Sequence, residues 1–283
     1  NALDSLVNRM RTSLIPGLLG VAHRNVSRGF TSLALSEMGL VFVPRNTLGT
    51  ADIPQGALKP DDATLAELYG STPHQPWCVA GLFLGPAVEK SPGVRERPSD
   101  VQDALDAVAV VCEALNASYE IHQDAHPAFH PGRFARIVVA GVDVGRVGEL
   151  LPSLATERDL PGRVSVFELD ADAILDAIGI EPHDAHALSV FPAATQDVSL
   201  VVDATLPAAQ LRDTLVEGMG ELLESLQVVD DYRGGGVPEG QKSLTFALRF
   251  RAADRTLTQA EATEAKEAGV ALAASRHSAT LRA

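Results

Sequence analysis

Residues 243–251 read SLTFALRFR and alternate strictly between apolar and polar side chains. The apolar positions are Leu244, Phe246, Leu248 and Phe250. A period of two is typical of a strand with one buried face and one exposed face. The exposed face would carry Arg249 and Arg251 beside small hydroxyl side chains. Two interpretations of that face stay open: an ordinary solvated sheet surface, or a surface that binds an anionic partner.

The segments around this strand complete a recognisable order of elements. In chain order they are a strand at 198–202, a helix at 207–223, a strand at 226–230, the quoted strand, a helix at 258–275 and a strand at 279–283. Pro207 suits the start of the first helix, and Thr258 with Glu261 forms a capping box for the second. The order βαββαβ predicts a ferredoxin-like domain whose two helices cover one sheet face and leave the other open.

The upstream part mixes strands and helices without a regular βαβ alternation. Strands are predicted at 33–43, 77–84, 119–123, 134–139, 142–147 and 164–169. This pattern favours an α+β domain built on an antiparallel sheet. A segment without clear periodicity and with two prolines follows position 180. We therefore predict one domain at 1–180, a linker at 181–190 and a second domain at 191–283.

The bulk composition limits the classes of function. The chain has 283 residues, 46% of them hydrophobic, and a formal net charge of −14, so it can form a substantial core in one or two domains. The acidic excess is larger before Phe191, which argues against nucleic-acid binding by the upstream domain alone. Bases outnumber acids between Arg233 and Arg255. Cys78 and Cys112 lie in apolar runs and predict buried thiols in a reducing compartment.

Two further features concern the ends and the membrane. No apolar run reaches the length of a membrane-spanning helix, and the N-terminus does not have the pattern of a signal peptide. The chain begins at Asn1, without a methionine and within what looks like a domain. We expect it to be a piece of a longer protein.

Motifs for the common catalytic sites are missing from the sequence. It has no glycine-rich phosphate loop after a strand, no nucleophile elbow and no HExxH pair. His122, His126 and His130 with Asp124 could suggest a metal site, and a small-molecule enzyme using these histidines is one alternative. Their spacing falls on a proline-containing loop instead of one helix face, so ordinary loop histidines are the preferred interpretation. We assign no catalytic residue and no metal ligand.

Several sequence blocks, in order along nearly the whole chain, resemble one known family. Downstream they are FP at 191–192, DYRG at 231–234, KSL at 242–244, DRTLT at 254–258 and LR at 281–282. Upstream they are RTSLIPGLL at 11–19, HPGRFA at 130–135, VGELLP at 147–152 and FELD at 167–170. The downstream part resembles the anticodon-binding ferredoxin-fold domain of bacterial phenylalanyl-tRNA synthetase β subunits. The upstream part resembles the catalytic-like domain of the same subunits.

This resemblance implies a class II synthetase-like fold without activity for the upstream domain. Class II catalysis needs an arginine on the second-motif strand, and the strand at 33–43 has none, although Arg45 lies just beyond it. The third motif needs glycine and arginine, and FELDADAIL at 167–175 has neither. Without such cations a site cannot neutralise the charge that develops during adenylate formation. The resemblance thus implies a scaffold for a catalytic α subunit.

The resemblance also implies the setting of the whole enzyme, a phenylalanine–tRNA ligase. It would use ATP and Mg²⁺, with no cofactor held by this chain, and it would be cytoplasmic with two α and two β chains. The chain would bind the anticodon region of tRNA(Phe). Editing would lie in segments before Asn1.

The resemblance and the predicted open face together suggest which residues bind tRNA. They are Tyr232, Arg233, Ser243, Arg249, Arg251 and Arg282. Phe246 and Phe250 fall on the core side, so several stacking aromatics are not expected. Members of the family usually carry arginine where this chain has Gln196. The alternative function is a free-standing RNA-binding or ligand-sensing ferredoxin-like protein with an inert companion domain.

Overall fold

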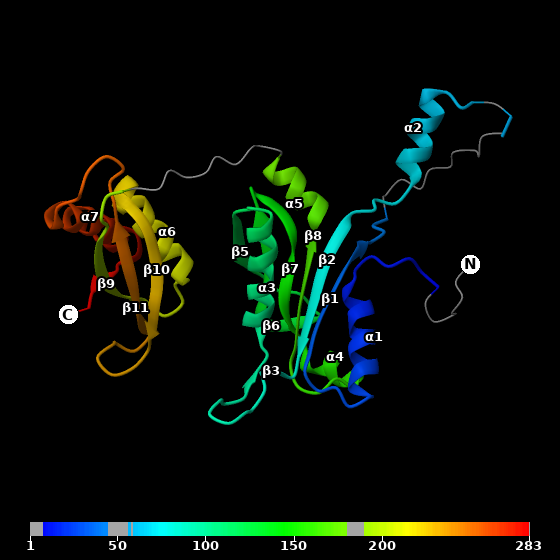
Figure 1. The fold of residues 1–283 in the computed structure, drawn as a ribbon, viewed down its shortest axis with the longest axis horizontal. Helices are drawn as coiled ribbons and strands as arrows, with labels where there is room; N and C mark the ends of the chain where they lie inside the picture. Colours follow the sequence, from blue (N-terminus) through cyan, green and yellow to red (C-terminus); the bar gives the residue numbers. More distant parts are fainter. Residues whose placement is uncertain (1–7, 45–55, 58, 180–189, 283) are drawn as a thin grey trace. The chain divides into compact units, whose positions relative to one another are not determined.

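The computed structural model describes residues 8–44, 56–57, 59–179 and 190–282, and these belong to two compact units (Figure 1). The units are Asn1–Pro182 and His183–Ala283. The predicted linker at 181–190 lies almost entirely outside the described residues, so its boundaries stay a prediction. Among the described helices, none combines the length and the apolar character needed to cross a membrane.

The upstream unit is built on a six-stranded antiparallel sheet in the order β1-β2-β8-β7-β6-β5 (Figure 1). Its strands are β1 (Leu33–Leu40), β2 (Trp77–Leu84), β5 (Tyr119–Gln123), β6 (Phe129–Val139), β7 (Val142–Leu150) and β8 (Val164–Asp170). The short strands β3 (Pro86–Val88) and β4 (Arg97–Pro98) pair with each other. The helices are α1 (Ile15–Val26), α2 (Asp62–Ser71), α3 (Val101–Ala114), α4 (Pro152–Glu157) and α5 (Ala171–Ile178).

The two faces of this sheet carry separate cores because neighbouring residues of a strand point to opposite sides. In β8, Val166 packs in the core that α1 and α4 complete, whereas Phe167 packs in the core that α3 and α5 complete. Both side chains are almost fully buried. A strand buried on both faces reads as a continuous apolar run, and β2 shows the same pattern.

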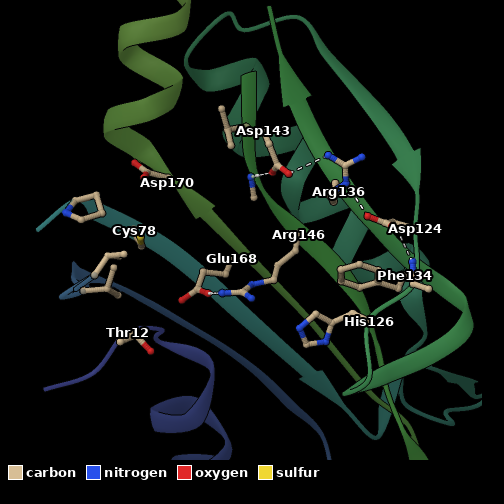
Figure 2. A pocket seen from close by; sticks show the side chains of 16 residues that line it. Thr12, Cys78, Asp124, His126, Phe134, Arg136, Asp143, Arg146, Glu168 and Asp170 are labelled. Atoms are coloured by element: carbon tan, nitrogen blue, oxygen red, sulfur yellow. Dashed lines mark hydrogen bonds and ion pairs between the residues drawn. The ribbon is translucent and has the colours of Figure 1, made fainter. Parts of the chain in front are cut away.

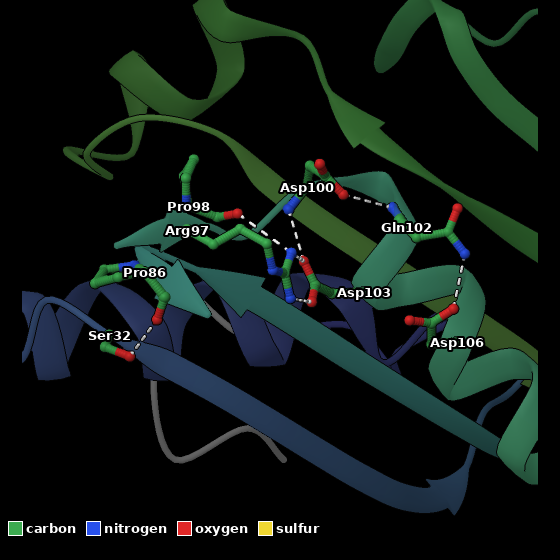
Figure 3. Close-up of polar contacts among 8 residues, drawn as sticks. All are labelled: Ser32, Pro86, Arg97, Pro98, Asp100, Gln102, Asp103 and Asp106. Carbon is green, nitrogen blue, oxygen red and sulfur yellow. Dashed lines mark hydrogen bonds and ion pairs between the residues drawn. The ribbon is translucent and has the colours of Figure 1, made fainter. Parts of the chain in front are cut away.

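A compact polar cluster fixes the start of α3 (Figure 3). Asp100 and Asp103 form a capping box, in which the Asp103 carboxylate accepts a hydrogen bond from the Asp100 backbone N–H at 2.9 Å. Arg97 donates two hydrogen bonds to the same carboxylate, at 2.6 and 3.0 Å. The Arg97 guanidinium holds the pKa of Asp103 below its ordinary value. The cluster therefore ties β4 to the helix through one ionised side chain.

We expect Asp103→Ala to lower the free energy of unfolding by about 1–2 kcal/mol at pH 7, because it removes one of the two hydrogen bonds of the capping box together with the ion pair to Arg97. A lowered pKa in the folded state stabilises above the ordinary pKa, and the stabilisation is lost as the pH falls through the folded value. The difference between the variant and the parent chain should therefore shrink below about pH 4. Urea unfolding at pH 7 and pH 3 measures it.

Asp106→Ala is the matched control for this experiment. Asp106 accepts one hydrogen bond from Gln102 on the exposed helix surface. Its loss should cost less than about 0.5 kcal/mol. A loss for Asp103→Ala that is as large at pH 3 as at pH 7 would contradict the role of the ionised carboxylate.

The downstream unit has the predicted βαββαβ order and the sheet order β10-β11-β9-β12. Its elements are β9 (Ala194–Asp203), α6 (Ala208–Met219), the 3₁₀ turn η1 (Gly220–Leu222), β10 (Leu223–Tyr232), β11 (Gln241–Phe250), α7 (Gln259–His277) and β12 (Thr280–Leu281). The α+β class and the ferredoxin-like architecture predicted from the sequence are confirmed. The first helix ends earlier than predicted, at Met219, because Gly220 adopts a positive φ of 68° that stops it.

The quoted stretch forms most of β11, one of the two inner strands. Phe246 and Phe250 are fully buried, and all four apolar side chains of the stretch belong to one core with both helices. The capping box of Thr258 and Glu261 begins α7 as predicted. The helices thus cover the face that holds the phenylalanines and leave the arginine-bearing face uncovered among the described residues.

Candidate functional site

The uncovered face of the downstream sheet is organised by strand register. One row across the four strands contains Tyr232, Ser243, Val201 and Thr280. The next row contains Asp230, Thr245 and Ser199, with Arg282 opposite Ser199. Residues that pair across antiparallel strands point to the same face. Register therefore brings Tyr232, Ser243 and Arg282, from distant parts of the sequence, onto one surface.

Tyr232 and Arg282 are in contact on this surface. Tyr232 ends β10 and Arg282 directly follows β12, the two outer strands, yet the Arg282 guanidinium carbon lies 4.6 Å from the centre of the Tyr232 ring. Both side chains must reach inward over β11 and β9 to make this contact. A guanidinium over an aromatic face is attracted by the quadrupole of the ring. The pair, which we call the platform, places an aromatic ring and a guanidinium together on the uncovered face.

Ser243 lies below the surface instead of on it. Its exposed fraction is 0%, and the neighbouring Val201 is 8% exposed, although no described helix covers this face. The position of these residues between Tyr232 and Arg282 explains their burial. The Ser243 hydroxyl has no hydrogen-bond partner among the described residues. Period two correctly placed Ser243 on this face, but it could not show that two longer side chains lie over it.

The other predicted arginines are held by carboxylates. Arg249 forms an ion pair with Glu224, and the Nε of Arg251 lies 2.8 Å from the other oxygen of that carboxylate. Arg251 also donates to the Phe191 carbonyl at 2.7 Å and is only 17% exposed. The hydrogen bond from Arg249 lowers the pKa of Glu224. These two arginines therefore present less positive charge than the sequence alone suggested.

Arg233 is similarly engaged, since its Nε donates to Asp231 at 3.0 Å and lowers the pKa of that carboxyl. Register also places Asp197 and Asp230 on the uncovered face. The prediction of a positively charged face needs correction, because the face carries both positive and negative side chains. The prediction considered only the side chains of β11, whereas the acids come from the neighbouring strands β9 and β10. Arg282 differs from the other three arginines in being held by an aromatic ring.

Gln196 points to the opposite side of the sheet. It pairs in register with Leu248, which lies in the core, and its side-chain amide donates to the Thr263 hydroxyl at 2.9 Å. Thr263 belongs to α7. The glutamine therefore tethers β9 to a helix and does not contribute to the uncovered face.

The upstream unit has a cavity of about 380 Å³ on the sheet face that carries α1 (Figure 2). Two arginines line it, and both are ion-paired. Arg146 lies 2.7 Å from Glu168, while Arg136 lies 2.7 Å from Asp124 and 3.1 Å from Asp143. Figure 2 shows these two clusters on neighbouring strands of the sheet.

Glu168, the glutamate of the FELD block, has a structural role. Its side chain is 6% exposed. One carboxylate oxygen accepts a hydrogen bond from the Leu14 backbone N–H at 2.5 Å, and the other accepts from the Ser13 hydroxyl at 2.9 Å and from Arg146. Glu168 thus joins β8 and β7 to the residues that begin α1.

This cavity does not fit the phosphates of ATP. The residues that line it include four carboxylates and two arginines, and both arginines are already paired. Burial, together with the nearby Asp170 and Glu168, raises the pKa of the Cys78 thiol to about 12. A thiolate is therefore disfavoured there, as a further anion would be. A triphosphate would enter a site in which the lining carboxylates outnumber the arginines by four to two.

The histidine loop does not form a metal centre. His122 lies 2.8 Å from Glu120, and Asp124 is engaged by Arg136. The His126 ring packs against Phe129, with ring centres 5.2 Å apart. Within the part of the chain that the structure describes, no group of three or more potential ligands could hold a metal ion. The enzyme alternative based on these histidines has no geometric support.

Comparison with known protein families identifies both units. Residues 1–171 match the family model described as phenylalanyl tRNA synthetase beta chain CLM domain, and residues 189–282 match the ferredoxin-fold anticodon binding domain. The chain is 48% identical over 287 residues to the phenylalanine–tRNA ligase beta subunit of Leifsonia xyli. It is 41% identical over 283 residues to that of Nocardia farcinica. Each alignment covers 100% of this chain and 34% of the relative, so the chain spans about a third of their length.

A solved structure also aligns with part of the chain. It is a pyrrolysyl-tRNA synthetase of Desulfitobacterium hafniense, with 14% identity, a TM-score of 0.38, and coverage of 58% of this chain and 48% of that one.

Proposed function

The chain belongs to the phenylalanyl-tRNA synthetase β-chain family, and we propose that it is a noncatalytic part of a phenylalanine–tRNA ligase. In this role it supports a catalytic α subunit and binds the anticodon region of tRNA(Phe) during ATP-dependent aminoacylation. The observation that carries the proposal is the presence of both family domains, in order, over residues 1–171 and 189–282. The same family assignment supports a cytoplasmic location.

The upstream unit acts as the scaffold in this proposal. Its cavity supports a noncatalytic role, because Arg136 and Arg146 are committed to internal carboxylates. Electrostatic stabilisation of phosphoryl chemistry needs cations that are free to meet developing charge. ATP and Mg²⁺ would therefore be bound by the α subunit, and no step of the reaction runs through this chain.

The downstream unit acts as the tRNA-binding part. Its uncovered face offers one aromatic platform, made by Tyr232 and Arg282, on which an unpaired base could stack. Such stacking is typically worth about 1–3 kcal/mol per base. Arg233, Ser243, Arg249 and Arg251 complete the proposed contacts, although each arginine among them also has a carboxylate partner. A single platform and mixed charges suit a modest contribution to a larger interface.

Co-expression with a phenylalanine-activating α chain tests the proposal. We expect one complex to form, and we expect this chain purified alone to show no ATP-dependent activation of phenylalanine. A chain that binds RNA equally well alone and gains no partner would instead support the free-standing alternative. Phenylalanine activation by this chain alone would refute the scaffold role.

We expect Arg282→Ala to weaken tRNA(Phe) binding about tenfold, because it removes half of the stacking platform together with a positive charge. Arg249→Ala should have a smaller effect, since Glu224 already neutralises that guanidinium. Filter binding with the assembled complex measures both variants, and circular dichroism checks that they remain folded.

Arg212→Ala is the matched control for these variants. Arg212 lies exposed on α6 and pairs with the adjacent Asp213. Its removal changes the net charge equally but leaves the uncovered face intact, so tRNA affinity should stay the same. Unchanged affinity in both Arg282→Ala and Arg249→Ala would remove the site assignment but not the family membership.

A further inference from the structure

A second cavity of the upstream unit, with a volume of about 330 Å³, differs in chemistry from the first. Its apolar lining comes from α1, the start of β6, the end of β7 and α4, and consists of Ile15, Pro16, Leu19, Ala128, Phe129, Leu150 and Leu154. Its polar lining consists of Thr12, Ser13, His126, Arg146 and Arg158. None of these described lining residues is acidic, whereas four acids line the first cavity. An anion with an apolar body is the complementary ligand.

Arg158 supplies positive charge that no described carboxylate neutralises. It follows the last turn of α4 and is exposed. Its backbone carbonyl lies 3.0 Å from His23, but its guanidinium forms no ion pair within the described residues. A guanidinium presents five N–H donors in a planar fork that matches a carboxylate. Arg158 can therefore bind an anionic group without giving up an existing partner.

Arg146 lies at the boundary between the two cavities. Its Nη2 donates to Glu168, a contact that Figure 2 shows. One hydrogen bond leaves most of the donors of a guanidinium unused. Arg146 can thus keep its bond to Glu168, which neutralises its charge, and still offer its other N–H donors to a ligand in the second cavity, where the unpaired positive charge comes from Arg158.

His126 adds a hydrogen-bond donor. Its contact with the Ala128 backbone determines which ring nitrogen carries the proton. The Nδ1 atom accepts a hydrogen bond from the Ala128 backbone N–H at 3.2 Å. In a neutral imidazole the nitrogen that accepts is unprotonated, so the proton is on Nε2. The ring is held in place by Phe129 and Phe134, whose centres lie 5.2 and 5.4 Å from its own. The Nε2–H of this fixed ring is therefore available to donate a hydrogen bond to a ligand.

We propose that this cavity binds a small monocarboxylate with an apolar body. The carboxylate accepts hydrogen bonds from Arg158, Arg146 and the His126 Nε2–H, and the body packs on the apolar lining. Ligand sites of this kind combine an apolar wall with a few polar groups that fix orientation. The proposal concerns the upstream unit and does not depend on tRNA binding or on an α subunit.

The test uses three six-carbon probes with the same apolar body and different heads: hexanoate, hexan-1-ol and hexylammonium. Calorimetry on the full 283-residue chain measures the three affinities. We expect hexanoate to bind about tenfold more tightly than the alcohol, since hydrogen bonds to a charged group add stabilisation of that order. Hexylammonium should bind most weakly. Equal affinities, or no binding of hexanoate, would overturn the proposal.

Variants of Arg158 locate the site. Arg158→Gln should weaken hexanoate binding about tenfold and leave the alcohol unaffected, and Arg158→Lys should restore part of the loss. Arg212→Gln makes the same charge change in the downstream unit and should leave hexanoate binding unchanged. The exposed position of Arg158 makes its variants fold normally, which circular dichroism verifies. Hexanoate affinity that does not respond to Arg158→Gln would reject this cavity as the site.

Discussion

Phe246→Ala is expected to lower the free energy of unfolding of the downstream unit by about 3–5 kcal/mol, the range for truncating a buried phenylalanine. The Phe246 ring is fully buried at the centre of β11, in a core shared with α6 and α7. Its removal leaves a cavity that the two helices can fill only in part. Because a domain is typically stable by about 5–15 kcal/mol, the loss is a large share of the total.

The two units permit a selective measurement of this loss. The single tryptophan, Trp77, lies in β2 of the upstream unit, so its fluorescence follows that unit. Hydrogen exchange of the β11 amides follows the downstream unit. We expect Phe246→Ala to accelerate exchange in β11 and to leave the Trp77 unfolding transition in place. The reverse pattern would contradict the separate cores.

Val228→Ala is the control for Phe246→Ala. Val228 pairs with Phe246 in register but is 42% exposed. Its truncation should cost less than about 1 kcal/mol, because it creates no enclosed cavity. A loss similar to that of Phe246→Ala would mean that strand propensity, instead of core packing, dominates the energetics of this sheet.

Glu168→Ala is expected to destabilise the upstream unit by about 2–4 kcal/mol. The substitution removes the acceptor for the buried Leu14 N–H, the Ser13 hydroxyl and Arg146 at once. The cost stays below that of a fully buried ion pair because Arg146 is 38% exposed and water can solvate it. Urea unfolding followed by Trp77 fluorescence measures the loss.

Two variants separate the causes. Glu168→Gln keeps an oxygen acceptor for Leu14 but removes the charge, so its loss should be smaller than that of the alanine variant. Glu113→Ala changes an exposed glutamate on α3 and should alter stability by less than about 0.5 kcal/mol. If Glu168→Ala and Glu113→Ala have equal effects, Glu168 does not anchor α1 to the sheet.

The candidate site could be predicted only in part from the sequence. Period two correctly assigned Arg249 and Ser243 to the uncovered face of β11. It could not predict that Glu224 would pair with Arg249, because a neighbouring strand supplies that glutamate. It also could not predict the burial of Ser243 beneath Tyr232 and Arg282, which are separated by 50 positions in the sequence and meet only in the folded sheet.

The cavities of the upstream unit could also be predicted only in part from the sequence. The sequence revealed that the FELD block lacks the cations of an adenylate-forming site. It did not reveal that Arg136 and Arg146 enter a cavity and are neutralised there by carboxylates from other positions. No local pattern joined Arg158 to His126, because His126 follows β5, Arg158 follows α4, and the two share a cavity only through folding.

The sequence by itself determined the α+β class, the βαββαβ order and the buried side of β11, because strand period, caps and turn residues act over a few neighbouring positions. It also determined the family, through blocks such as DYRG and FELD. Only the tertiary structure decided which charges remain free and which side chains are covered. Those properties depend on register and on contacts between distant strands, where a carboxylate or a ring from elsewhere in the chain changes what an arginine or a serine can bind.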